Sequence, residues 1–309
     1  MTTRREVFPL IAGAAGVSAA ASPANAAAAS EPELRRVSYK SARTGKERDY
    51  FVYLPRGFAQ QKHWPVMLFL HGDGERGDAR GELDFVLIHG PVFEAWCQRR
   101  DLPFVIISPQ LDKFSRGEIP YIKHRDAAKI PRRLPSGINA RPNAGDVRLP
   151  GPMQGAMSDD KLPDGPAGPP DGWNEMESEL VAMVDRTIAD FKGDAKRVYL
   201  TGLSYGGFGA WHLAARHPQK FAALAPIVGY GHPDHAEPIA GAKLPVWVFA
   251  GGRDPVVALR FFYPALNKLE ALGHPEVRFT VEEDLGHLAW VRVYEGQDLY
   301  SWMLAQSRS

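Results

Sequence analysis

Residues 198–215 read VYLTGLSYGGFGAWHLAA and carry the clearest indication of the fold. This stretch begins with a continuous apolar run, residues 198–201, of the kind that forms a strand buried on both faces. It continues as a helical pattern from residue 207 to residue 216. Between the two lies a Gly-x-Ser-x-Gly motif at residues 202–206. The stretch therefore predicts a strand, a sharp turn and a helix, with the hydroxyl of Ser204 exposed at the turn.

Similar patterns run along the rest of the chain. Apolar runs that end near Gly or Pro predict further buried strands at residues 65–70, 104–108, 245–250 and 277–281. Helical patterns cover residues 175–192, 207–216, 260–272 and 296–306. Two short strands within residues 37–54 are expected to pair antiparallel around a turn. The alternation of strands and helices predicts an α/β protein whose mainly parallel sheet carries helices on both faces.

Composition sets limits on the class of protein. The chain has 309 residues, of which 44% are hydrophobic and 24% charged, as in soluble globular proteins. A net charge of +1 gives no reason to expect nucleic acid as a partner. The one cysteine, Cys97, excludes an intramolecular disulfide and a cysteine-based zinc site, and we expect it to be buried. Residues 27–309 are expected to form a single domain.

The first 26 residues are expected to be an export signal peptide. A cationic start with Arg4 and Arg5 precedes an apolar run at residues 7–21, and an A-x-A pattern ends at Ala26. The arginine pair favours the twin-arginine route, and the general secretory route stays open. The apolar run is too short for a membrane span. We therefore expect a periplasmic or secreted protein with no stable membrane anchor.

Residues 112–172 interrupt the pattern and predict a long insertion. They contain 10 of the 26 prolines and show no apolar periodicity. Such a segment is usually functional or disordered, so two interpretations are open: a lid over the site that acts on substrate choice, or a solvated loop. Several basic side chains could meet an acidic group such as a uronate: Arg116, Lys123, Arg125, Arg132 and Arg133.

The chain offers the partners that a nucleophilic Ser204 needs. A serine hydroxyl requires a general base, and His287 follows the strand predicted at residues 277–281. The imidazole in turn requires a carboxylate, and Asp254 follows the strand predicted at residues 245–250. The chain order Ser204, Asp254, His287 is the order of α/β-hydrolases. The carboxylates that compete with Asp254 for this role are Asp284 and Asp234.

An oxyanion hole is expected beside this triad. One donor should be the backbone N–H of Tyr205, directly after the nucleophile. The second should come from the glycine-rich loop at residues 71–77, with the amide of Asp73 favoured and that of Gly74 second. We expect His71, in the same loop, to brace the loop rather than to act as a catalytic base.

Several of these segments resemble a known family, the α/β-hydrolase serine esterases of the "predicted peptidase" group. That group is similar to polyhydroxybutyrate depolymerases and to feruloyl and acetyl xylan esterases. The segments that carry the resemblance are residues 51–55, 70–77, 108–110, 201–207, 251–257, 286–290 and 299–303. The resemblance implies the α/β-hydrolase fold and the triad named above.

The sequence and the resemblance together predict an exported serine carboxylesterase that works through an acyl-enzyme. Export and the family point to an acyl or aryl ester, on a small molecule or linked to a polysaccharide or polyester. Neither a metal nor an organic cofactor is expected, and no substrate-binding residue is indicated. Two alternatives stay open: a serine peptidase of the prolyl oligopeptidase type, which would use the same triad, and a catalytically inactive binding module.

Overall fold

A twisted sheet forms the centre of the molecule. The structure is a computed structural model and describes residues 30–141, 152–155, 157–159 and 161–308. The expected signal peptide at residues 1–26 lies outside this part of the chain. The strands of the sheet are β1 (Glu33–Lys40), β2 (Glu47–Leu54), β3 (Trp64–Leu70), β4 (Val105–Ser108), β5 (Gly193–Leu203), β6 (Ala223–Ile227), β7 (Val246–Gly251) and β8 (Val277–Glu282). They form one eight-stranded sheet in the order β1-β2-β4-β3-β5-β6-β7-β8.

The sheet is mainly parallel, as predicted. Strand β2 is antiparallel to both β1 and β4, and every other neighbouring pair is parallel. Because parallel strands run in the same direction, the carboxyl ends of β3, β5, β7 and β8 lie at the same edge of the sheet. Ligands of open α/β sheets bind at this edge.

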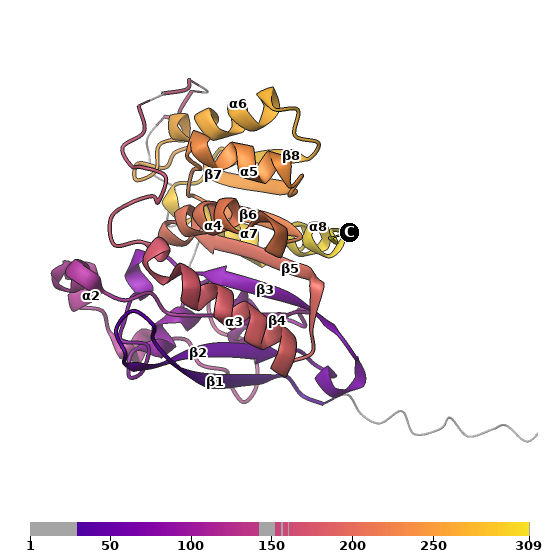
Figure 1. Ribbon diagram of the computed structural model, residues 1–309. Coiled ribbons are helices and arrows are strands. Elements are labelled where there is room, and N and C mark those ends of the chain that lie inside the picture. Colours follow the sequence, from indigo (N-terminus) through magenta and orange to yellow (C-terminus); the bar gives the residue numbers. More distant parts are fainter. Residues whose placement is uncertain (1–29, 142–151, 156, 160, 309) are drawn as a thin grey trace, which may run out of the picture.

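Helices cover both faces of the sheet, as predicted. One face carries α3 (Glu177–Asp190), α4 (Tyr205–Arg216), α5 (Ala236–Gly241) and α6 (Tyr263–Ala271). Figure 1 shows α3 and α5 in front of the strands and α6 at the top. The other face carries α1 (Gly90–Val92), α7 (Trp290–Glu295) and α8 (Asp298–Leu304). The remaining short helix, α2 (Pro120–Lys123), belongs to the insertion and lies at one side of the molecule (Figure 1).

The two hydrophobic cores explain the continuous apolar runs. In β3, Val66 and Leu68 belong to the core under α3 and α4, whereas Met67 and Phe69 belong to the core under α7 and α8. Successive side chains of a strand point to opposite faces, so a strand covered on both sides must be apolar at every position. Cys97 is buried in the second core, as expected, and burial raises the pKa of its thiol to about 12.

The structure also contains elements that the sequence patterns did not predict. Strand β6 includes Pro226, and proline usually argues against a central strand. Helices α5 and α7 have six residues each, too few for a clear apolar period. In the described part of the insertion, regular structure is limited to α2 and short 3₁₀ turns. No helix in the described ranges is long and apolar enough to cross a membrane.

Candidate active site

Ser204 occupies the tight turn between β5 and α4. Its backbone has φ 51° and ψ −117°, a conformation that costs a residue with a side chain on the order of 1–3 kcal/mol. A Cβ atom on Gly202 would lie 2.2 Å from the carbonyl oxygen of Gly206, and a Cβ atom on Gly206 would lie 1.9 Å from that of Leu70. The motif therefore needs glycine at both places, because the backbones approach so closely.

The imidazole of His287 lies between Ser204 and Asp254. Its Nε2 is 3.0 Å from Oγ of Ser204, and its Nδ1 is 2.8 Å from Oδ2 of Asp254. An ionised carboxylate can only accept, so Nδ1 donates to Asp254 and Nε2 is left to accept the proton of the serine hydroxyl. The structure thus brings the three predicted residues into one hydrogen-bonded chain, from loops that follow β5, β7 and β8.

Asp254 is held by its own loop. The side chain is fully buried, and its Oδ1 accepts hydrogen bonds from the amides of Val256 at 2.8 Å and Val257 at 3.0 Å. The second oxygen is left for His287. These bonds fix the orientation of the carboxylate, so the imidazole is presented to Ser204 in one tautomer.

The competing carboxylates are engaged elsewhere. Both oxygens of Asp284 pair with the guanidinium of Arg292, at 2.7 and 2.8 Å. Asp234 lies 3.3 Å from the ring of His232, at the start of a short turn before α5. The position beside Nδ1 of His287 is therefore taken by Asp254.

An aromatic side chain that the sequence patterns did not single out supports His287. The ring of Trp290 meets the imidazole edge to face, with centroids 5.2 Å apart and an interplanar angle of 84°. Trp290 also contacts the ring of His89, with centroids 5.5 Å apart. Trp290 begins α7, and only the family resemblance drew attention to it. Its packing restricts the rotation of the imidazole.

The amides of Tyr205 and Asp73 remain the candidate donors of an oxyanion hole. Tyr205 begins α4 and Asp73 begins a 3₁₀ turn, Asp73–Glu75, and the first N–H groups of a helix have no acceptor within it. A Cβ atom on Gly72 would lie 2.7 Å from Cδ1 of Leu203, so the two loops pack closely. Gly74 remains the second candidate donor, and its carbonyl accepts a hydrogen bond from Arg125.

Two buried polar side chains hold the loop that contains Asp73. His71 accepts the amide of Leu111 on Nε2 at 2.9 Å, and burial lowers its pKa to about 3. The side-chain oxygen of Gln110 accepts a hydrogen bond from the backbone N–H of Ala79 at 2.7 Å, and its side-chain nitrogen donates to the carbonyl of Glu75 at 2.8 Å. His71 thus braces the loop, as expected. Gln110 was not predicted as a site residue, although its motif contributes to the family resemblance.

The side chain of Asp73 is the centre of a polar cluster. It accepts hydrogen bonds from Arg76 at 2.5 Å, from Arg116 at 2.7–3.0 Å and from the hydroxyl of Tyr121. Burial acts to raise the pKa of the carboxyl, but the hydrogen bonds from Arg116 and Tyr121 and the charge of Arg76 hold it below its usual range. The ring of Tyr205 contacts both guanidinium groups, at 4.7 Å from Arg76 and 5.0 Å from Arg116.

Other basic residues of the insertion also have partners. Arg125 pairs with Glu82 at 3.0 Å and Lys123 with Glu118 at 2.5 Å, while Arg133 donates to the carbonyl of Trp96. Together with the pairing of Arg116, these contacts use much of the positive charge that the sequence left for an acidic substrate group.

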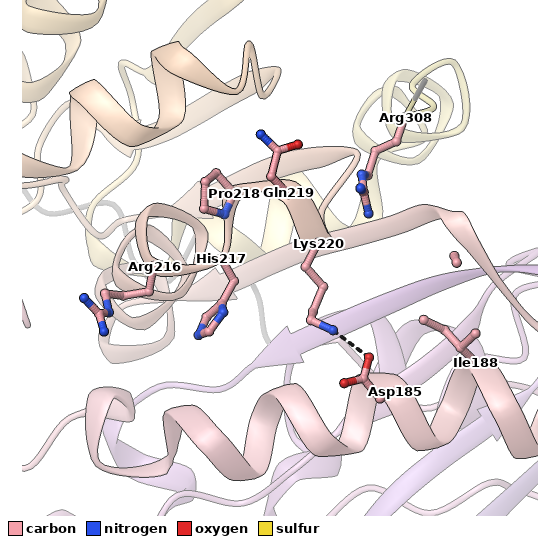
Figure 2. A pocket seen from close by; sticks show the side chains of 9 residues that line it. Asp185, Ile188, Arg216, His217, Pro218, Gln219, Lys220 and Arg308 are labelled. Carbon is pink, nitrogen blue, oxygen red and sulfur yellow. Dashed lines mark hydrogen bonds and ion pairs between the residues drawn. The ribbon is translucent and has the colours of Figure 1, made fainter.

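A pocket at the far end of α4 is separate from these residues. It measures about 440 Å³ and is lined by Asp185, Ile188, Ala195, Arg216, His217, Pro218, Gln219, Lys220 and Arg308. Figure 2 shows Lys220 pairing with Asp185 across it, at 2.5 Å. A helix rises 1.5 Å per residue, so Arg216, at the end of α4, lies roughly 16 Å along the axis from Tyr205. The pocket is therefore not part of the candidate site.

Comparisons with known proteins place the fold. No family model matches the chain. The feruloyl esterase B of Neurospora crassa is 45% identical over 53 residues, which are 17% of this chain and 18% of that protein. The poly(3-hydroxyalkanoate) depolymerase C of Paucimonas lemoignei is 49% identical over 47 residues, 15% of this chain and 11% of that protein. The matched segments thus span less than a fifth of either relative.

Among solved structures, a thermostable esterase superposes with a TM-score of 0.58 and 24% identity, over 89% of this chain and 63% of that chain. Such a likeness shows the fold. It agrees with the mainly parallel sheet, and the expected resemblance to esterases is confirmed by the names of the relatives. The chain therefore has the α/β-hydrolase fold, and the proteins that it resembles are esterases and a polyester depolymerase.

Proposed function

We propose that this protein is a serine hydrolase of carboxylic esters, with Ser204, His287 and Asp254 as its catalytic triad. The observation that carries the proposal is the unbroken hydrogen-bonded chain from Oγ of Ser204 through the imidazole to the buried carboxylate. It occurs at the strained turn where hydrolases of this fold expose their nucleophile. The names of the relatives support ester bonds as the target.

The proposed mechanism follows from the geometry. As Ser204 attacks the ester carbonyl, Nε2 of His287 takes the hydroxyl proton, and Asp254 stabilises the imidazolium that forms. The imidazolium then protonates the leaving alcohol, which leaves the acyl group on Ser204. Water, deprotonated by the same imidazole, attacks the acyl-enzyme, and the serine hydroxyl is restored.

The amides of Tyr205 and Asp73 would stabilise the oxyanion in both halves of the cycle. Both belong to the first residue of a helical turn, where N–H groups and the helix dipole favour negative charge. Removing one such donor in another serine hydrolase costs on the order of 10²–10³ in turnover. The second donor comes from a loop that side chains outside it hold in place through hydrogen bonds, so we expect the hole to be formed before substrate binds.

For the substrate, we propose an acyl or aryl ester linked to a polysaccharide or a polyester. The name of the first sequence relative, a feruloyl esterase, supports an aryl ester, and the name of the second, a poly(3-hydroxyalkanoate) depolymerase, supports a polyester. We also propose that the protein is exported, on the basis of the cationic start and apolar run in its first 26 residues. Sequencing the amino terminus of the protein recovered outside the cytoplasm tests this, with cleavage expected after Ala26.

Labelling and an activity panel test the proposed function. An organophosphonate should modify Ser204, as read by mass spectrometry. Ser204→Ala should lose both the label and the hydrolysis of p-nitrophenyl acetate, whereas Ser178→Ala, on the first turn of α3, should keep both. A feruloyl ester and a peptide amide complete the panel. An adduct on another serine would overturn the triad, and faster cleavage of the amide would favour the peptidase alternative.

A further inference from the structure

The insertion at residues 112–172 contacts the proposed site from two sides. Arg116 and Tyr121 meet the loop of Asp73, and Gln154 meets the loop of Asp254. We propose that these three side chains are positioning residues for the chemical step, so that the insertion holds the oxyanion loop and the catalytic acid in place. This inference rests on the proposed function, and it differs from the expectation that the insertion acts on substrate choice alone.

Arg116 grips the carboxylate of Asp73 through two nitrogen atoms. Its Nε lies 2.8 and 3.0 Å from the two carboxylate oxygens, and its Nη2 lies 2.7 Å from Oδ2. The hydroxyl of Tyr121 donates to the same Oδ2. Such charge-assisted, forked contacts are strong and orient both partners. Arg76 also binds this carboxylate, but it belongs to the same loop, whereas Arg116 and Tyr121 anchor the loop from outside.

These contacts reach both proposed oxyanion donors. The side chain that Arg116 holds belongs to Asp73, whose amide is one donor. The ring that Arg116 covers, at 5.0 Å, belongs to Tyr205, whose amide is the other. One guanidinium from the insertion therefore ties together the two residues that must point their N–H groups at a single oxygen atom. Donors aimed in advance at the developing charge lower the barrier of the chemical step.

Gln154 holds the loop of Asp254 in a similar way. Its backbone N–H donates to the carbonyl of Gly252 at 2.9 Å, and its side-chain Nε2 donates to the backbone carbonyl of Asp254 at 2.6 Å. Its Oε1 accepts the amide of Leu259 at 2.8 Å. One residue thus fixes the backbone before, at and after Asp254, the carboxylate of the proposed triad. These bonds complement the two that the carboxylate receives within its own loop.

A positioning role predicts a specific kinetic change. A displacement of about 1 Å can cost on the order of 100-fold in rate, even for a substrate too small to contact the insertion. Loss of these contacts should therefore lower kcat for p-nitrophenyl acetate and leave KM almost unchanged. An insertion that only selects substrates would instead change KM, or would change the rates on bulky esters alone.

The test uses Arg116→Leu, Tyr121→Phe and Gln154→Met. We expect Arg116→Leu and Gln154→Met to lower kcat about 10- to 100-fold, with KM within about threefold, and to slow the phosphonate labelling of Ser204 in parallel. Tyr121→Phe, which loses one hydroxyl on a half-exposed ring, should show a smaller loss. Arg116→Lys should recover part of the rate, because an ammonium group keeps the charge but not the forked geometry.

Matched controls come from the same segment. Lys123→Met and Asp159→Asn each remove an exposed ion pair, to Glu118 and to Arg260, and should keep the wild-type kcat. If Arg116→Leu or Gln154→Met does not fold, as judged by its thermal transition, then Arg116→Lys, Tyr121→Phe and Gln154→Glu decide the question.

The outcomes separate the two proposals. A wild-type protein that neither labels at Ser204 nor hydrolyses any ester would refute the proposed function. An active wild-type protein whose folded variants all keep the wild-type kcat would refute the positioning role alone. A change confined to KM would do the same, because it would assign the insertion to substrate binding.

Discussion

Replacing Glu75 by glutamine should remove a pH-dependent loss of stability from the wild-type protein. Glu75 is a buried residue, 5% exposed, and its carboxyl group lies 3.9 Å from the ring of His71 and 3.9 Å from that of His89. Burial lowers the pKa of His71 to about 3 and that of His89 to about 4, so neither ring is a cation near neutral pH. Burial accordingly raises the pKa of Glu75 to about 7, and nearby Asp73 adds to the effect.

The magnitude follows from the difference between the folded and unfolded states. The pKa of Glu75 moves from an ordinary 4.5 to about 7, and one pH unit of such a difference corresponds to about 1.4 kcal/mol. The folded state therefore favours the protonated carboxyl by about 3 kcal/mol. Because the folded pKa is the higher one, this stabilisation is fully present below pH 4.5 and is lost as the pH rises through about 7.

Urea denaturation of both proteins between pH 4.5 and 8 measures the effect. Glutamine resembles the protonated carboxyl and does not titrate, and both proteins keep His71 and His89. The free energy of unfolding of the wild-type protein should therefore fall by about 3 kcal/mol relative to Glu75→Gln over this range. Glu82→Gln serves as a control, and its difference from the wild-type protein should stay nearly constant over this pH range. Burial acts to raise the pKa of Glu82, but Lys113 and Arg125 hold it below its usual value. A constant difference between wild type and Glu75→Gln would refute the reasoning.

Two further predictions concern the proposed triad and the turn. Asp254→Asn should keep the thermal transition but lose on the order of 10⁴ in turnover of p-nitrophenyl acetate, the precedent for this change in another serine hydrolase; full activity would move the role to another carboxylate, Asp284 first. Gly206→Ala should lower the free energy of unfolding by about 1–3 kcal/mol or more, because its Cβ would meet the carbonyl of Leu70. In the matched control Gly74→Ala, nothing lies within 4 Å of the new Cβ, and denaturation should show a smaller change.

The strands and the residues of the proposed triad could be predicted because local rules determine them. A strand buried on both faces must be apolar throughout, so β3, β4, β5 and β7 stand out in the sequence. The catalytic role of Ser204 could be predicted because its turn requires glycine at positions 202 and 206, and the sequence has glycine at both. Asp254 and His287 followed from their positions at strand ends. Strand β6 escaped prediction because Pro226 resembles a loop residue, and the structure tolerates it between β5 and β7.

The supporting residues around the site could not be predicted in this way. Gln110 and His71 act through hydrogen bonds to backbone groups about 30 to 40 residues away in the chain, and such contacts leave no periodic pattern. Trp290 supports His287 from the start of a six-residue helix. Glu75 looks like an ordinary surface carboxylate in the sequence. Only the fold shows that it is buried and lies near the imidazoles of His71 and His89.

The insertion shows the same limit and leads to one more expectation. Its prolines and charges predicted a lid or a solvated loop, because polar side chains usually face water. The side chains of Arg116, Tyr121 and Gln154 instead form hydrogen bonds with the two loops that contain Asp73 and Asp254. Replacing residues 114–170 by a short Gly-Ser linker would remove all three at once. In protein that keeps its thermal transition, we expect hydrolysis of a small acetyl ester to fall together with that of a bulky feruloyl ester. If the small ester were spared and only the bulky one affected, the insertion would act on substrate choice alone.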